Sequence, residues 1–583
     1  MQDRKTFERT SRVLNSKLRK YLIPTIATEL AMSLDEFVDS IIVANMLGLK
    51  AMTVVGVASP IVLVIAATYI LFGIGGSTLY AFNIGQRDTK KAGKILAISF
   101  SSAMLVSLLV CFIGLFALEP ISAFLCGEES MRADLMNYLR VLFISAPFII
   151  GIQTITAFLP AAGLPNIATL VCLIANATNL TFDYIYIRFF DLGVAGTACA
   201  TLTGYVFCLI MFIVLILRKK IRLYVTKPHI KDFRNLRGIV GQGGANALGQ
   251  VGYTIKFTFY NHITFSVGGT VALQVFSVVK QILSIMSIGL AGVADAAGPF
   301  MATLKGQKDN KGIRFVLKSS MLISTLISGA LVLLFEVFPE LLYKMFNVTD
   351  PAVISVATTA VRIFLVMFLV RGIYILFMGY ARIIERKTYA MAISLLDGFV
   401  LLIPVALLCK ELFGLNGIWA SFPVNSALLL LGMVLYNTIL AKKSDGALEG
   451  LFLIPNEDGV KIYDMTITPE NETISEMSES LIAFCRENGV KKENAQNIGL
   501  IAEEMALYTR LHRKKNENID VLVRIMDDSV TLDFRSEGLP FNPLAKSEED
   551  SEENIALINR VPSEVVYNYI LGMNSTKFTV KKA

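Results

Sequence analysis

Long apolar runs recur along the chain from Tyr21 to about Leu440, and they restrict its fold more than any other feature. Each run has about 20 residues or more, enough for a helix to cross a hydrocarbon core about 30 Å thick. Only 17% of the residues are charged, against about 25% in an ordinary soluble domain. We therefore expect an all-α polytopic membrane protein with twelve transmembrane helices. These fall at residues 21–45, 52–82, 95–118, 137–160, 167–188, 193–217, 239–265, 270–303, 315–338, 354–380, 388–409 and 414–440.

The distribution of basic residues predicts how the chain is oriented. Residues 1–20 contain seven Lys and Arg, and the stretch from Arg218 to Arg237 contains eight, whereas the stretch from Glu119 to Tyr138 contains one. Because loops rich in Lys and Arg stay in the cytoplasm, we expect the basic N-terminus and the basic linker at 219–238 on that side of the cell membrane. An even number of spans places the C-terminus there too. The basic residues are thus topology anchors rather than a nucleic-acid surface.

An internal repeat divides the membrane part into two lobes. The sequence Gly85-Gln-Arg-Asp88 returns later in the chain as Gly306-Gln-Lys-Asp309, and Gly193-Val-Ala-Gly196 returns at the same offset as Gly414-Leu-Asn-Gly417. Six spans in each lobe give both lobes the same orientation, as in transporters that bind their substrates between or within two such halves. The predicted lobes are residues 21–218 and 239–441.

Acidic residues stand in the middle of the first apolar segment. Asp35 and Asp39 are four residues apart, so they share one face of a helix, with Glu36 rotated by about 100°. An ionised carboxylate in hydrocarbon costs several kcal/mol unless it faces protein or a water-filled cavity. We therefore predict that these acids line a pathway through the protein.

Short motifs follow one another along the membrane part. They are Val38-Asp-Ser-Ile-Ile-Val-Ala-Asn-Met-Leu-Gly48, Val55-Gly-Val-Ala-Ser-Pro60, Gly75-Gly-Ser-Thr78, Gly85-Gln-Arg-Asp88, Ala162-Gly-Leu-Pro-Asn166, Asn179-Leu-Thr-Phe-Asp183 and Gly193-Val-Ala-Gly-Thr-Ala-Cys-Ala-Thr201. In this order they resemble the MATE (multidrug and toxic compound extrusion) family, in its DinF-like branch, over about residues 15–441. The resemblance implies a secondary active transporter, not an enzyme, that exports small molecules by alternating access between the lobes.

The same resemblance implies a cation site in the N-terminal lobe, made of Asp39, Asn179, Asp183 and Thr201. Carboxylate, amide and hydroxyl oxygens are hard ligands that suit a hard cation and fit Zn or Cu poorly. Repulsion between two nearby carboxylates also raises the pKa of one of them, so a proton can bind there in place of a metal ion. The coupling ion is thus H⁺ or Na⁺, and no other cofactor or metal is expected. Alternatively, Asn179 and Asp183 only cap or bond neighbouring helices.

Pro24 matches the kink proline of the family. A proline inside a helix removes one backbone hydrogen bond and permits bending. The alternative is that Pro24 only marks the start of the first helix.

The C-terminal lobe departs from this pattern. The positions that the repeat makes equivalent to Asn179 and Asp183 are Val400 and Pro404, so coupling is expected in the N-terminal lobe alone. Lys256, in turn, is the repeat equivalent of Asp35. Our hypothesis is that Asp35 and Lys256 form an ion pair across the two lobes, which breaks when the lobes change state. The alternative is that Lys256 pairs within its own lobe or reaches to the membrane surface.

From residue 446 to 583 the sequence becomes charged and predicts a soluble α+β domain. Residues 452–468 and 519–535 alternate as strands do, and residues 472–488 and 494–512 have helical periodicity. The runs Ile498–Ala506, Glu537–Pro543 and Ala556–Asn574 together resemble a GHKL ATPase domain of the anti-sigma-factor kinase type.

The nucleotide site of that resemblance is degenerate. Glu504 is kept as a possible general base, but Tyr508 stands where the family has an Asn that holds Mg²⁺. Ser536, two residues before Gly538, stands where the family has an Asp that reads adenine. The lid at 552–556 lacks glycine and carries acids that would repel phosphate. We expect a regulatory or protein-binding domain that does not hydrolyse ATP.

Together these features predict a cation-coupled antiporter for small, lipophilic, cationic compounds. Its partners would be the substrate, membrane lipid and a cytoplasmic protein bound by the C-terminal domain, with no nucleic acid. Two alternatives remain, a membrane-tethered sensor or anti-sigma-type kinase, and a flippase for lipid-linked substrates.

Overall fold

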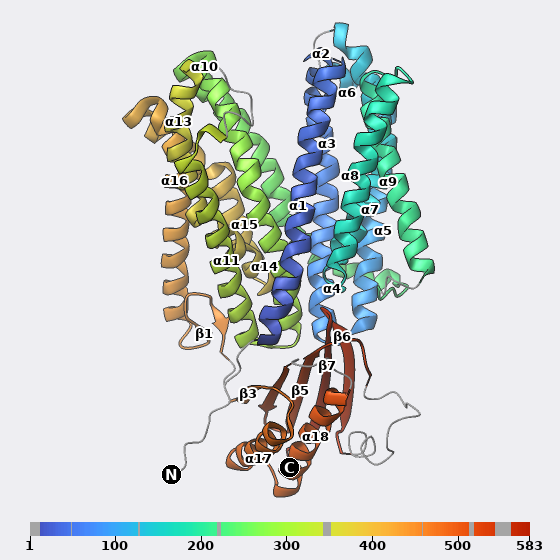
Figure 1. Cartoon of the computed structure of the whole chain (residues 1–583), viewed down its shortest axis with the longest axis vertical. Helices are drawn as coiled ribbons and strands as arrows, with labels where there is room; N and C mark the ends of the chain where they lie inside the picture. The colour runs from blue at the N-terminus through green and yellow to red at the C-terminus, as the bar shows by residue number, and fades with distance from the viewer. Residues whose placement is uncertain are drawn as a thin grey trace.

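The structure is a computed structural model that describes residues 12–47, 49–125, 129–218, 223–341, 351–456, 459–511, 518–542 and 561–582. Its membrane part is built of helices (Figure 1). The first half contains α1 (Arg12–Leu47), α2 (Leu49–Val57), α3 (Ser59–Tyr69), the π-helical turn η1 (Ile70–Ile74), α4 (Gly75–Gly85), α5 (Thr89–Phe116), α6 (Leu118–Leu125), α7 (Glu129–Phe158), α8 (Pro165–Arg188) and α9 (Val194–Leu217). The second half contains η2 (Ile230–Asn235), α10 (Leu236–Gly306), α11 (Asn310–Val337), α13 (Pro351–Leu365), α14 (Phe368–Ile383), α15 (Lys387–Leu395), the π-helical turn η3 (Leu396–Val400) and α16 (Leu402–Lys443).

Most predicted apolar segments fall on one helix or on one arm of a bent helix. Segment 52–82 instead covers α2, α3, η1 and α4, segment 354–380 covers α13 and α14, and segment 388–409 covers α15, η3 and the first arm of α16. Within the described residues, eight helices are long and apolar enough to cross a membrane, or nine if the bent pair Val353–Leu365 and Phe368–Ile383 is one span. The long helices α10 and α16 are each interrupted by a glycine with positive φ, Gly269 (63°) and Gly414 (59°), so each consists of two arms. The prediction of a mostly helical, polytopic membrane protein is therefore confirmed.

The internal repeat is also visible in the backbone conformation. Arg87 and Lys308, which are equivalent in the repeat, both have positive φ, at 65° and 58°. Such values are uncommon for residues other than glycine. The next residue in each loop, Asp88 or Asp309, caps the following helix by accepting a backbone N–H bond of 2.8 Å. The two loops thus have the same local structure, once in each half.

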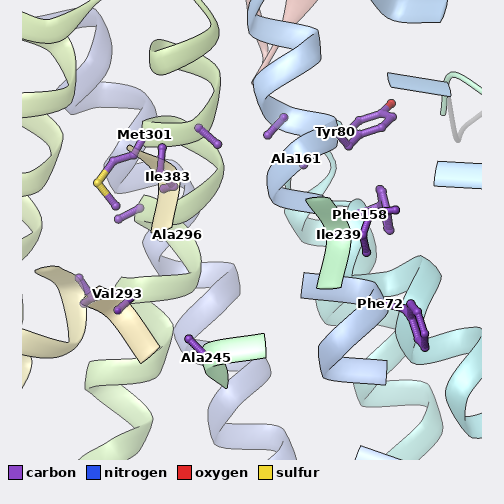
Figure 2. Packing of buried hydrophobic residues seen from close by; sticks show 14 of the residues in the cluster. Phe72, Tyr80, Phe158, Ala161, Ile239, Ala245, Val293, Ala296, Met301 and Ile383 are labelled. Atoms are coloured by element: carbon purple, nitrogen blue, oxygen red, sulfur yellow. The ribbon is translucent and has the colours of Figure 1, made fainter. Parts of the chain in front are cut away.

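The two halves meet near the C-terminal domain and stand apart at the opposite end (Figure 1). One cluster of buried apolar side chains contains residues of both halves, among them Tyr80 and Phe158 from the first half and Met301 from the second (Figure 2). Between α4 and α10 the backbones approach so closely that a methyl group on Gly85 would overlap the carbonyl group of Thr303. Tight backbone packing therefore closes the molecule at this end.

The C-terminal domain is α+β, as predicted. A five-stranded antiparallel sheet has the order β3-β4-β5-β7-β6 and follows the short hairpin of β1 and β2. Residues 519–535 form the β4–β5 hairpin, in which Val521 lies opposite Phe534. Helices α17 and α18 pack on one face of the sheet over a core that includes Val523 and Leu532. The elements are β1 (Leu448–Glu449), β2 (Ile454–Pro455), β3 (Lys461–Ile467), α17 (Asn471–Glu487), α18 (Lys492–Leu511), β4 (Ile519–Ile525), β5 (Ser529–Glu537), β6 (Glu564–Ile570) and β7 (Met573–Lys581).

The other face of the sheet is polar and docks on the two repeat loops of the membrane part. Arg87 of the first loop forms an ion pair of 2.7 Å with Asp533 of β5. Asp309 of the second loop forms an ion pair of 2.6 Å with Arg535, two residues further along β5. Each of these four side chains is at most 7% exposed. One strand of the C-terminal domain therefore holds both halves of the membrane part.

A third arginine completes this charged interface. Arg524 of β4 lies 3.4 Å from Asp533 and donates a hydrogen bond of 2.9 Å to the backbone carbonyl of Lys308. Burial opposes the ionisation of Asp533, but Arg87, Arg524 and Arg535 outweigh it and hold the pKa of Asp533 below its usual value. The carboxylate is thus ionised at neutral pH and balances several cations at once.

Replacing Arg535 by Ala should loosen the docked C-terminal domain. Asp309 would lose the guanidinium group that balances its buried charge, and breaking such a pair costs about 3–5 kcal/mol. Hydrogen–deuterium exchange of the loop at 306–310 and of β5 should become faster in this variant. Lys581→Ala, an exposed residue at the far end of the same sheet, is the matched control. Equal protection in both variants would contradict a role for the ion pair in docking.

Candidate functional site

The structure brings three of the four predicted cation-site residues together inside the first half. Asn179 and Asp183 lie one turn apart on α8, with exposed fractions of 8% and 0%. The Asn179 Nδ2 atom donates a hydrogen bond of 3.1 Å to the Oγ1 atom of Thr201 on α9. With the oxygen and nitrogen of the amide exchanged, Nδ2 would instead lie 3.3 Å from the Oδ2 atom of Asp183, and the amide oxygen would accept from Thr201. Asn179 thus links the hydroxyl and the carboxylate.

A glycine on α9 makes this approach possible. A methyl group on Gly204 would lie 2.8 Å from the carbonyl oxygen of Ala175 and 3.6 Å from the backbone nitrogen of Asn179. Any larger residue at Gly204 would therefore push α9 away from the part of α8 that carries the site. The local packing of the two helices fixes the distance between Asn179 and Thr201.

The fourth predicted residue, Asp39, lies on α1, as does Asp35, and the side chains of both lie outside the part that the structure describes. Helix α1 is bonded to α8 before it reaches them. Asn176 donates a hydrogen bond of 2.7 Å to the carbonyl of Ala31, and Thr169 donates one of 2.8 Å to the carbonyl of Pro24. Pro24 stands inside α1, so it does not mark the start of the helix.

The second half contains a buried cluster with the opposite charge balance. Asp397, in the π-helical turn η3, forms an ion pair of 3.2 Å with Arg371 and accepts a hydrogen bond of 2.7 Å from the hydroxyl of Tyr374. Lys256 of α10, which is 3% exposed, interacts electrostatically with the same carboxylate. Lys256 is thus balanced within its own half. Since the Asp35 side chain is not described, the pair across the lobes stays a prediction.

Sequence reasoning missed a pair of acids between the halves. Glu29 of α1 and Asp295 of α10 interact electrostatically, as do Asp295 and Arg382 of α14. Arg382 also donates a hydrogen bond of 3.3 Å to the backbone carbonyl of Gln242. The sequence signal that could have found this pair is an acid inside an apolar segment, the same kind of signal that pointed to Asp35.

The residues of the degenerate nucleotide site lie in the C-terminal domain on α18 and around the end of β5. Glu504 and Tyr508 stand one turn apart on α18, Ser536 is the penultimate residue of β5, and Gly538 follows with φ of 128°. The ring centroids of Tyr508 and Phe541 are 5.7 Å apart. An aromatic contact therefore occupies the position at which the resemblance implies an Asn for Mg²⁺.

Two further features bear on this site. Burial and the neighbouring Glu503 raise the pKa of Glu504, so its carboxylate is harder to ionise than an ordinary Glu. The predicted lid at 552–556 lies outside the described residues.

The two helical halves and their buried polar clusters define a multi-pass membrane transporter. The model of the MatE family matches residues 24–185 and 244–408, and the chain belongs to this family of transporters. It is therefore a secondary transporter and not an enzyme. The family match ends before the C-terminal domain.

Curated relatives of the membrane part are multidrug exporters. The chain is similar to the multidrug export protein MepA of Staphylococcus saprophyticus, with 24% identity over 383 residues, which cover 64% of this chain and 83% of that protein. It is also similar to MepA of Staphylococcus aureus strain MRSA252, with 25% identity over 374 residues, which cover 63% of this chain and 80% of that protein.

Solved structures share the fold of the membrane part. A MATE transporter in complex with MaD3S superposes with a TM-score of 0.68 at 20% identity, over 74% of this chain and 96% of that chain. A MOP superfamily transporter from Pyrococcus furiosus, described as having a binding pocket of reverse polarity, superposes with a TM-score of 0.67 at 21% identity, over 74% and 96%.

Removing the carboxylate of Asp397 should destabilise the protein more than removing Lys256. Asp397→Asn removes the negative charge that balances the buried side chains of Lys256 and Arg371. Losing such a counter-charge costs about 3–5 kcal/mol of stability. Lys256→Met keeps the ion pair of Asp397 with Arg371, so its melting temperature in detergent should fall by less than half as much. A Lys256→Met effect that is lost in an Asp35→Asn background would instead support the pair across the lobes.

Proposed function

We propose that this chain is a cation-coupled antiporter with twelve spans and both termini in the cytoplasm, which exports small, lipophilic, cationic compounds across the cell membrane. The observation that carries the proposal is the fully buried carboxylate of Asp183 beside Asn179 and Thr201 in the first half. A carboxylate in such a place is a functional group by default. The multidrug export function of the MepA relatives supports the substrate class.

In this mechanism H⁺ or Na⁺ binds at Asp39, Asn179, Asp183 and Thr201. The amide and hydroxyl oxygens supply uncharged ligands, and the two acids supply the negative charge. When the cation leaves, the two carboxylates repel each other in a low dielectric. The helices that carry these carboxylates, α1 and α8, must then shift. This shift changes which end of the space between the lobes is open.

Efflux of a cationic dye from proteoliposomes should follow either an imposed pH gradient or an imposed Na⁺ gradient. Asp39→Asn and Asp183→Asn should each abolish gradient-driven efflux, because a neutral amide cannot exchange a proton or balance Na⁺. Asp191→Asn, an exposed acid just after α8, is the matched control and should keep the wild-type rate. Gradient-driven efflux at the wild-type rate in Asp183→Asn would refute this site as the coupling site.

The C-terminal domain, in our proposal, is a regulatory clamp that retains the outline of a GHKL domain without hydrolysing ATP. Its support is the pair of buried ion bridges, from Asp533 to Arg87 and from Arg535 to Asp309, which reach one repeat loop of each half. A rigid body that binds both halves at their closed end resists their separation there. A cytoplasmic protein that competes for the polar face of the sheet would release the lobes.

Weakening the clamp should raise the transport rate. Arg535→Ala, and deletion of everything after residue 445, should both speed dye efflux several-fold under the same gradient, because the closed end can open more readily. The measurement is the initial rate in proteoliposomes with equal amounts of inserted protein. Slower efflux in both proteins would mean that the domain supports transport instead of restraining it.

A flippase for lipid-linked substrates is the second candidate. The cluster of Lys256 and Arg371 against the single carboxylate of Asp397 favours it, since an excess of positive charge suits an anionic substrate. A sensor kinase is less well supported, because Tyr508 and Ser536 replace the residues that would hold Mg²⁺ and adenine. Binding of ATP to the full-length protein would favour the sensor kinase over the flippase and the antiporter.

A further inference from the structure

A groove of about 1210 Å³ lies between the two halves near the docked C-terminal domain. Its walls come from α3, α4 and α5 of the first half and from η2, the start of α10 and α15 of the second half. Because it takes residues from both halves, the occupant of this groove would touch both moving parts of the transporter.

Five basic side chains line the groove. The lining includes Lys91 of α5, Lys231 and Arg234 of η2, Arg237 of α10 and Lys387 of α15. Among the described residues none of these five forms an ion pair with an acid. Their uncompensated charge attracts an anionic group.

One acid lines the groove, and its charge is already balanced. Asp232 lies 3.0 Å from the Nζ atom of Lys94 and accepts a hydrogen bond of 2.8 Å from the backbone nitrogen of His229. The hydrogen bond from His229 and the ion pair with Lys94 lower the pKa of Asp232. The carboxylate is thus ionised and engaged, so it does not cancel the five cations.

Much of the remaining lining is apolar and half-buried, with Leu71, Leu79, Ala247 and Met391 among its residues. An anion alone would leave these walls uncovered. A hydrocarbon chain would fill the space between them, since burying apolar surface is favourable by about 25 cal/mol per Å² in general. A groove at the end of membrane helices that is lined by both basic and apolar side chains matches a phospholipid, with the phosphate on the basic residues and the acyl chain on the apolar ones.

We propose that this groove binds an anionic glycerophospholipid such as phosphatidylglycerol. The phosphate sits among the five basic residues, and an acyl chain lies between Leu71 and Met391. Under the proposed orientation the lipid comes from the cytoplasmic leaflet. The site does not depend on which compound the transporter exports.

The test measures lipid binding to the full-length protein in detergent, by native mass spectrometry and by competition with a fluorescent phosphatidylglycerol. Wild type should bind phosphatidylglycerol at least ten-fold more tightly than phosphatidylcholine. Each Lys or Arg near a lipid phosphate contributes about five-fold in affinity. The variant Lys91→Gln/Arg237→Gln/Lys387→Gln should therefore lose at least ten-fold, and the single variant Lys387→Gln about five-fold if the triple variant does not fold.

The matched control is Lys90→Gln/Lys442→Gln/Lys443→Gln, which removes three exposed cations that do not line the groove. An equal loss in this control would overturn the proposal in favour of general surface charge. Competition by free glycerol phosphate as strong as that of the lipid would overturn it in favour of a site for soluble phosphate.

Discussion

The cost of placing charge in hydrocarbon determines where the ionisable residues of this transporter lie. In the first half, the buried carboxylate of Asp183 lies beside an amide that can bond it. In the second half, the carboxylate of Asp397 lies against Arg371 and near Lys256. The two halves share a repeat, yet among the described residues the first buries Asp183 with an amide and a hydroxyl, and the second buries one carboxylate with two cations.

The same constraint explains the interface with the C-terminal domain. A sheet covered by helices on one face usually exposes its other face to water, but here the residues of β5 are buried along nearly the whole strand. Asp533 and Arg535 alternate with Leu532 and Phe534, so the charged pair faces the repeat loops and the apolar pair faces α18. Each buried charge finds its counter-charge in the other part of the chain. The charges of β5 are therefore complementary to the charges of the two repeat loops.

The sequence could predict what depends on local order. Apolar length located the membrane helices, the constant offset between two pairs of motifs located the repeat, and the spacing of Asn179 and Asp183 placed them on one face of α8. It could not predict partners set by tertiary packing. For Lys256 the sequence left two alternatives open, a partner across the lobes or one within its own lobe. The electrostatic interaction with Asp397 supports the second, while the pair with Asp35 stays a prediction because the side chain of Asp35 is not described.

Helix α1 connects the predicted cation site with the docked domain, and its chemistry fixes where it can bend. Lys20 forms an ion pair of 2.9 Å with Glu537 of the C-terminal domain, so the start of the helix is held from outside the membrane part. Beyond Pro24 the helix is held by α8, since Thr169 donates to the Pro24 carbonyl and Asn176 donates to that of Ala31. Pro24 has no backbone N–H to donate to the carbonyl of Lys20, which stands four residues earlier. The missing bond falls between the part held by the domain and the part held by the lobe. A bend at Pro24, as the sequence predicts, would take up a displacement of either part, because bending there breaks no backbone bond that the helix had made.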